Sequence, residues 1–422
     1  MTIRAVSRFV HIAGDQSLPF PYYLVALAAA FVACLCPGTL RAQTLTDLSD
    51  VGQATDATPA PAPSATTPPA TTPAASASGE PMAAQVGTRA ALRAQNPNTR
   101  SKINDVGLEG EADVVLRGRL HPFLKWQAGF IGAFAPQTAA NSATLLDLVA
   151  KLEFTEAFNL WVGRMSIPSD RASLSTVWAI APWTLPGRYS VYAPYTAGNA
   201  RPAPGPRQGD ADRGDGATMW GQLGGGTFKY YLGVFGLDQP ETSPLYSARL
   251  ALSLLNPEPG FRSSSAYFGT KDVLALGVGV QHRTGDSRPP ALDATPVGDF
   301  NELNADLLFE KGSANAGVLN VESSFAKLWG DNELASYQFF ALVSYLVPVD
   351  IGIGRLQPLV RIQHAGKGSA VDAGDFTSID AQLGYIIDGF HARVLGVYQY
   401  SKVQGDIENA VLLGIQLLSH SK

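Results

Sequence analysis

The chain is poor in cysteine, in charge and in long apolar runs. Its only two cysteines, Cys34 and Cys36, both lie in one short apolar segment near the N-terminus. The rest of the chain therefore has neither a disulfide nor a thiolate ligand for a structural metal site. Charged residues make up 16% of the 422 residues, whereas about 25% is usual in soluble proteins. This composition argues against an ordinary soluble globular protein.

One continuous apolar run occurs, from about Tyr22 to Leu35, and it is too short to predict a membrane-spanning helix. It follows two arginines and ends shortly before Ala42. This arrangement predicts a signal peptide over residues 1–42 that is removed on export. A retained anchor and a lipoprotein cleavage site before Cys34 are the alternatives.

Catalytic and metal-binding patterns are also scarce. No histidine is paired with another at ligand spacing, and the acidic residues form no calcium-binding loop. We therefore expect no metal, no cofactor and no enzymatic activity. His391 beside Arg393 is the one position where the active site of an outer-membrane hydrolase could be sought. The 31 basic residues are fewer than the 36 acidic ones, which argues against nucleic acid as a partner.

Residues 43–105 are predicted to form a disordered linker in the periplasm. From Asp56 to Gly79 the chain consists almost entirely of proline, alanine, threonine and serine. Such a composition buries too little apolar surface to fold. Near 82–95 the pattern fits a short helix or a first strand equally well. The linker could act as a simple spacer or as a tether in contact with peptidoglycan.

From about Leu108 to Leu418 the sequence is rich in segments where apolar and polar residues alternate with a period of two. Between Leu108 and Leu120 one parity is small or apolar throughout, whereas the other carries five charges. The two sets point to opposite faces of a strand. Charges in this number cannot be buried in a dry core, so the polar face must meet water. Repeated in segments of about ten residues after an export signal, this pattern predicts a transmembrane β-barrel.

Fifteen strands can be placed by this pattern, but bacterial single-chain barrels have even strand numbers. A further strand is therefore expected within about 84–105. The predicted fold is an all-β, antiparallel transmembrane β-barrel of sixteen strands over residues 106–422, with fourteen and eighteen as alternatives. Short and long connections alternate, as periplasmic turns and outer loops should. Asn256–Asp272 is an exception, because it is long where a short turn is expected.

The segment from Pro168 to Gly216 is the one region with functional character. It places about fifty residues between two strands, far more than an ordinary loop. We expect it to fold into the barrel and narrow a water-filled lumen; an exposed outer loop is the alternative. Acidic residues are as numerous as basic ones on the polar faces, so the sign of any charge selectivity stays open. The pore-lining or constriction candidates are Arg117, Arg119, Lys125, Arg164, Asp170, Arg171, Arg188, Arg213, Asp215, Arg249, Arg355, Arg361 and Arg393.

Three motifs carry a resemblance to a known family. They are Leu-Trp-Val-Gly-Arg-Met-Ser-Ile-Pro-Ser-Asp-Arg over 160–171, Asp-Gly-Ala-Thr-Met-Trp-Gly-Gln over 215–222, and Ser-Ala-Arg-Leu-Ala-Leu over 247–252. Together they resemble the strand ends that flank the long loop in the phosphate-selective porin O/P-like family. The resemblance implies a sixteen-stranded, trimeric outer-membrane channel for small anions or general solutes. The chain has no dense lysine cluster of the kind that would support phosphate selectivity.

The sequence therefore predicts a porin in the bacterial outer membrane. It would be a passive diffusion channel for small hydrophilic solutes or ions, anions among them, working by size exclusion and charge at a constriction. The expected partners are outer-membrane lipid, the solutes and two further copies of the chain in a homotrimer. A closed structural or tethering barrel is the first alternative, and an outer-membrane hydrolase is the second.

Overall fold

The computed structural model describes residues 82–97, 105–135, 140–186, 213–236, 243–285, 299–313, 315–331, 335–369, 375–403 and 405–420. The predicted signal peptide, most of the predicted linker and residues 187–212 of the long loop, among them Arg188, lie outside these ranges. None of the helices in these ranges is long and apolar enough to cross a membrane.

Strands dominate the described residues. One of them, β13, has two residues and lies in the turn between β12 and β14, which pair with each other directly. The strands are β1 (Ala83–Pro97), β2 (Asp105–His121), β3 (Leu124–Ala135), β4 (Ala140–Thr155), β5 (Phe158–Ser166), β6 (Arg213–Leu223), β7 (Phe228–Phe235), β8 (Leu245–Ser253), β9 (Val273–Arg283), β10 (Phe300–Ser313), β11 (Gly317–Gly330), β12 (Ala335–Leu346), β13 (Asp350–Ile351), β14 (Gly354–Lys367), β15 (Phe376–Asp388), β16 (Ala392–Val403) and β17 (Asp406–His420).

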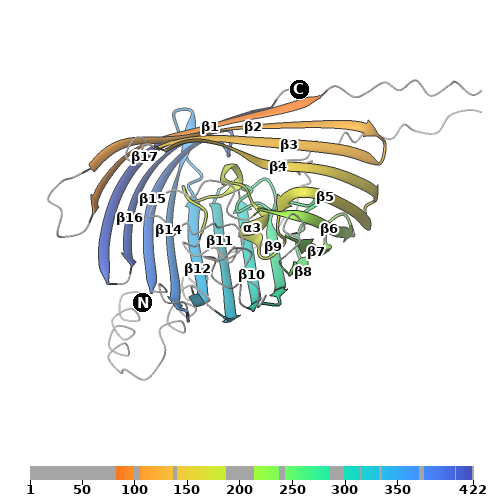
Figure 1. The fold of residues 1–422 in the computed structure, drawn as a ribbon. Coiled ribbons are helices and arrows are strands. Elements are labelled where there is room, and N and C mark those ends of the chain that lie inside the picture. The colour runs from red at the N-terminus through yellow and green to blue at the C-terminus, as the bar shows by residue number, and fades with distance from the viewer. Residues whose placement is uncertain are drawn as a thin grey trace, which may run out of the picture. The chain divides into compact units, whose positions relative to one another are not determined.

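The sheet closes on itself (Figure 1). β1 pairs with β2 on one side and with β17 on the other, and all the strand pairs are antiparallel. Apart from the short β13, sixteen strands form the wall, so the predicted strand number is confirmed. The strand expected within 84–105 is β1, which lies in the segment where the sequence left a helix or a strand open.

Alternate side chains point to lipid and to the interior. Leu148 and Val360 are 55% and 56% exposed, whereas their neighbours Asp147 and Arg361 are 2% and 1% exposed. The apolar side chains thus face outward and the polar ones inward, the reverse of a soluble protein. Because closed strand pairing satisfies the backbone amides and carbonyls, such a wall is stable in lipid.

Tyrosines mark the rim at which most connections are short, here called the turn end. The hydroxyls of Tyr230, Tyr345 and Tyr385 donate to carbonyl oxygens of neighbouring turns at 2.7, 2.7 and 2.5 Å. Their rings lie on the outward face of the wall. An apolar ring with a bonded hydroxyl suits the boundary between lipid and water.

One connection at the turn end departs from this pattern. Residues 254–272 join β8 to β9, where a short turn was expected, and they fold into the barrel. We call them the turn insert. From the opposite rim, the loop end, residues 167–186 after β5 also fold inward, and we call them the loop insert. The two inserts position the candidate site.

Candidate pore constriction

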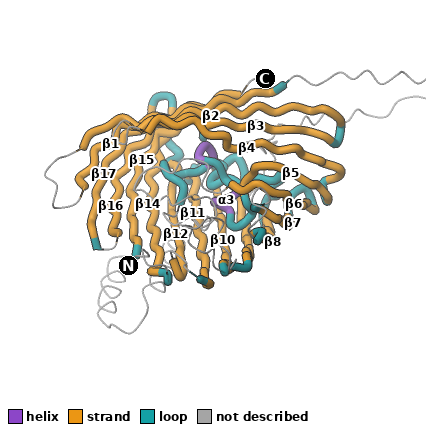
Figure 2. The backbone as a smooth tube through the Cα atoms, viewed as in Figure 1, coloured by secondary structure: helices purple, strands orange, loops and turns teal. Residues whose placement is uncertain are grey.

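The loop insert crosses the interior from one wall to the other. It contains α3 (Arg171–Leu174), where Asp170 caps the helix by accepting the amide of Ser173 at 2.9 Å, and the short helix η2 (Val177–Ala179). Figure 2 shows α3 within the ring of strands. Near its start, the insert contacts β8 and β10. Further along, Trp178 donates its ring N–H to Asp113 on β2 at 2.7 Å.

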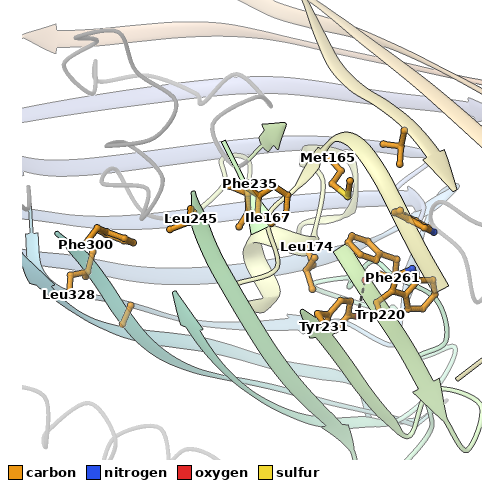
Figure 3. Close-up of a cluster of buried hydrophobic side chains, with 13 residues drawn as sticks. Met165, Ile167, Leu174, Trp220, Tyr231, Phe235, Leu245, Phe261, Phe300 and Leu328 are labelled. Atoms are coloured by element: carbon orange, nitrogen blue, oxygen red, sulfur yellow. Dashed lines mark hydrogen bonds between the residues drawn. The ribbon is translucent and has the colours of Figure 1, made fainter. Parts of the chain in front are cut away.

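The turn insert is anchored by an aromatic cluster. Phe261 stacks on Trp161 with ring centroids 4.3 Å apart and meets Trp220 and Tyr231 edge-on at 5.5 and 5.3 Å. The Tyr231 hydroxyl also donates to the Phe261 carbonyl at 2.9 Å. Figure 3 shows this ring beside Leu174 of the loop insert. The turn insert therefore places a buried aromatic side chain, Phe261, inside the barrel.

The two inserts meet at a buried ion pair. The Arg171 guanidinium donates to both carboxylate oxygens of Glu258, one at 2.8 Å, and to the Ser264 carbonyl at 2.8 Å. Backbone hydrogen bonds from Ser263 to Leu174 and from Ser265 to Ala179 extend the contact. The side chains of Arg171 and Glu258 are each 3% exposed.

This pair shifts the titration of both of its members. Burial disfavours the charged form of Glu258, but the charge and hydrogen bonds of Arg171 outweigh it and hold the Glu258 pKa well below its usual range. Burial likewise opposes the charge on Arg171, and Glu258 outweighs it, so the pKa of Arg171 is raised. Both groups are therefore charged at neutral pH.

Arginines of the wall bind the loop insert through its carbonyl groups. Arg361 and Arg393 donate to the Thr184 and Ala181 carbonyls at 2.6 and 3.0 Å, and Arg249 donates to the Ser169 carbonyl at 2.9 Å. Arg89 on β1 does the same toward Trp183. Three of these four arginines were sequence candidates. Arg89 was missed because the sequence left its segment open between a helix and a strand.

Carboxylates of β10 accept hydrogen bonds from N–H and O–H groups of the two inserts. Glu310 accepts the amides of Tyr267 and Gly269, each at 2.8 Å, and Glu302 accepts the Ser169 hydroxyl at 2.7 Å. Asp306 accepts the amide of Arg171 at 3.2 Å. An acidic wall thus holds N–H and O–H groups, while arginines elsewhere on the wall hold carbonyls.

Other sequence candidates lie away from the inserts. Lys125 forms an ion pair with Glu153 at 2.7 Å near the turn end, Arg119 is exposed, and Arg355 is half-buried at the start of β14. His391, considered above as a hydrolase position, lies on an exposed turn with its Nδ1 3.4 Å from an oxygen of Asp388.

Arg164 and Asp215 form an ion pair at 2.9 Å on the outward face. Arg164 lies opposite Leu148, a lipid-facing residue, in the β4–β5 register, and opposite Asp215 in the β5–β6 register. Gly163, which directly precedes Arg164, has φ of +130°, and a Cβ there would lie 2.0 Å from the Leu148 carbonyl oxygen. Only glycine fits there.

A small cleft of about 20 Å³, enough for about one water molecule, lies between the loop insert and the wall of β1 to β4. Asp147 is its charged centre, because it accepts hydrogen bonds from Arg213 at 3.0 Å and from Arg262 and Gln127 at 2.9 Å. Its lining residues are Gln85, Asp113, Val115, Arg117, Gln127, Leu146, Asp147, Ser175, Thr176, Val177, Trp178, Leu185, Arg213 and Arg262.

The cleft brings together arginines that are far apart in sequence. Arg117 comes from β2, Arg213 from β6 and Arg262 from the turn insert. Arg262 was not a sequence candidate, since an irregular segment carries no alternation that would show which way a side chain points. Within the described ranges, no group of three or more histidine, cysteine or acidic residues could hold a metal ion.

No family model matches the sequence, and no curated protein matches it either. Solved porin structures do match its fold. OmpF of Salmonella typhi, in a complex with daunomycin, is 13% identical with a TM-score of 0.50, over 79% of this chain and 97% of that one. The anion-selective porin of Comamonas acidovorans is 11% identical with a TM-score of 0.50, over 80% of this chain and 99% of that one.

At this level of identity the likeness concerns the fold. Together with the closed sheet, the apolar outward face and the polar inward face, it gives one consistent assignment. The chain has the sixteen-stranded antiparallel fold of porins, and that fold places it in the bacterial outer membrane.

Proposed function

We propose that the protein is a porin, a passive diffusion channel for small hydrophilic solutes or ions. The observation that carries this proposal is the closed sixteen-strand wall with polar side chains inside and a long loop folded into its lumen. A barrel of this size encloses enough space for an aqueous path. Diffusion down a gradient needs no cofactor, metal or catalytic group, and we assign none.

The cleft beside β1 to β4 is the constriction in this proposal. The two inserts pack against β5 to β11 and against the arginines of β14 and β16. The loop insert also bonds to Arg89 on β1 and to Asp113 on β2, so the passage is confined to the cleft beside these contacts. A narrow cleft excludes large solutes by size, and its fixed charges sort the small ones by sign. Among the described lining residues three guanidiniums face two carboxylates, which favours anions.

A homotrimer is part of the same proposal. The family resemblance implies it, and the outward Arg164–Asp215 pair supplies a reason within this chain. Charged side chains on a lipid-facing surface are destabilising, whereas a neighbouring subunit could cover the pair with polar groups. Export through a signal peptide over residues 1–42 and a linker that reaches peptidoglycan complete the proposal.

A closed structural barrel is the second candidate, and burial of the inward side chains favours it. Arg393 and Gln416 are fully buried, and Asp380 is 2% exposed. Polar side chains that line a wide water-filled lumen would be more exposed. In a closed barrel the same contacts would make a solid interior around the two inserts.

Single-channel conductance in a planar bilayer tests the proposal. The refolded protein is first shown to be folded by its heat-modifiable migration in gels. Discrete conductance steps are the expected result, small ones because the inserts fill much of the interior. Silence from a correctly folded barrel would reject the channel and leave the closed barrel as the function.

A further inference from the structure

Three features distinguish the outward side of the wall around β5, and charge is the first. Arg164 on β5 and Asp215 on β6 lie directly opposite each other in the strand register, with side chains 26% and 37% exposed. The Arg164 Nε also donates to the Leu145 carbonyl at 3.1 Å. Lipid tails cannot solvate such a pair, whereas polar groups of another protein molecule can. This part of the wall therefore suits a protein neighbour better than lipid.

The second feature is the height of the wall. β5, β6, β7 and β8 have 9, 11, 8 and 9 residues, whereas β14 and β15 have 14 and 13. The four short strands lie side by side in one sector of the barrel (Figure 1). A strand of eight residues tilted by about 40° rises only about 20 Å, less than the apolar band of about 25 Å. Association with another subunit is one way to accommodate a span that is too short for the bilayer.

The third feature is a row of phenylalanines at the turn end. The ring of Phe154 lies 5.8 Å from those of both Phe123 and Phe158, and all three side chains are exposed. On the far side of the barrel, Tyr345 and Tyr385 bind turn carbonyls through their hydroxyls. Phenylalanine has no polar group for the boundary between lipid and water. Three stacked phenylalanines are thus better suited to an apolar protein contact.

We propose that the outward face of β4 to β7, here called the β5 face, is where a second copy of this chain docks. Charge complementarity selects this partner. Arg164 and Asp215 lie side by side, so a symmetry axis along the membrane normal and close to this face brings Arg164 of one copy near the equivalent of Asp215 in the next. The inference rests on the homotrimer in the proposed function and adds the position of its contact.

Photo-cross-linking in intact outer membranes tests the position. The photoreactive residue p-benzoylphenylalanine is introduced at Val162, which is 44% exposed on β5. We expect covalent oligomers of this chain, identified by mass spectrometry of the cross-linked peptides. Val360 is the matched control, because it is 56% exposed and lies on β14, which is opposite β5 in the ring of strands. The same probe at Val360 should give no oligomer.

Three results of this experiment would overturn the inference. Lipid adducts alone at Val162 would show that the β5 face meets lipid, and cross-links to a different protein would replace the second copy as its partner. Oligomers from Val360 and none from Val162 would move the contact to another face and leave the homotrimer standing. A chain that migrates as a monomer in unheated gels would remove the homotrimer together with the inference.

A double variant tests the ion pair itself. Arg164→Leu combined with Asp215→Leu removes both charges and leaves no unpaired partner. If the pair holds two copies together, the oligomer in gels should dissociate to monomers at a lower temperature than the wild type. The heat-modifiable migration of the monomer shows that the variant barrel is folded. An unchanged dissociation temperature would contradict the inference. Wild-type barrels that assemble as oligomers but do not conduct would reject the channel alone.

Discussion

Two parts of the wall use arginine in opposite ways. On β14 and β16, Arg361 and Arg393 point inward and bind carbonyl groups of the loop insert. Around the cleft, Arg117 and Arg213 also point inward, but the cleft lies beside them and the loop insert does not fill it. From the sequence, the two pairs of arginines cannot be told apart, because all four are charged residues on the polar face of a strand. Their different roles come from where the inserts lie.

The comparison shows that an inward charge is not by itself a solute contact. Arg361 and Arg393 are 1% and 0% exposed, so they act on the loop insert and only indirectly on solutes. A substitution there should change the shape of the passage. A substitution of Arg117 or Arg213 at the cleft should change its charge preference. Stability and conductance measured together can separate the two classes.

The largest effect on stability is expected at the pair that joins the two inserts. Glu258→Gln leaves Arg171 buried without its counter-charge, which should lower the free energy of unfolding by about 3 to 5 kcal/mol. Urea unfolding in lipid vesicles measures this loss. Loosened inserts should also raise the single-channel conductance. Wild-type stability in Glu258→Gln would show that the inserts are held by the aromatic cluster around Phe261 instead.

The pH dependence of that pair has a defined sign. The folded pKa of Glu258 lies below its unfolded value, which is about 4.3. Its stabilisation is therefore complete above that unfolded pKa and is lost as the pH falls toward the folded pKa. The stability difference between wild type and Glu258→Gln should be greatest at neutral pH and smaller at pH of about 3. A difference that grows on acidification would contradict this assignment.

A smaller effect is expected where the loop insert is anchored to β14. Arg361→Gln removes the bond to the Thr184 carbonyl and the ion pair with Asp380. Asp380 keeps donors from Ser378 and Gln399 at 3.1 and 3.0 Å, so the loss should be about 2 kcal/mol. Conductance should rise with little change in charge preference. The exposed Arg119, changed to Gln, provides the control.

The wall was predictable because lipid and a polar interior impose one rule on every strand. The alternation around Asp147 and Leu148 is the same signal in sequence and in structure. Even strand number then required a strand before β2, and β1 is found there. Arg164 shows the limit of choosing by position. It belongs to the motif that carries the family resemblance, whereas alternation counted from the inward Trp161 turns it outward.

The inserts were not predictable to the same extent. A long loop that enters the barrel has a signal in its length, but the wall side chain that meets each of its carbonyls depends on how it crosses the lumen. The turn insert showed only as an exception in the alternation of turn lengths. Neither Phe261 nor Arg262 belongs to a periodic pattern. The sequence therefore does not show that Phe261 packs in the aromatic cluster or that Arg262 lines the cleft; only the folded structure does.

The smallest effect is expected at an ion pair of similar length in a wetter place. Lys125 and Glu153 lie 2.7 Å apart, with side chains 29% and 20% exposed, near the turn end. Water solvates both charges when the pair is broken, so Lys125→Met should cost about 0 to 1 kcal/mol. The Arg171–Glu258 pair has no such compensation. Equal losses in Lys125→Met and Glu258→Gln would mean that water reaches the contact between the inserts, and the interior would then have to be far more open than the burial of its side chains indicates.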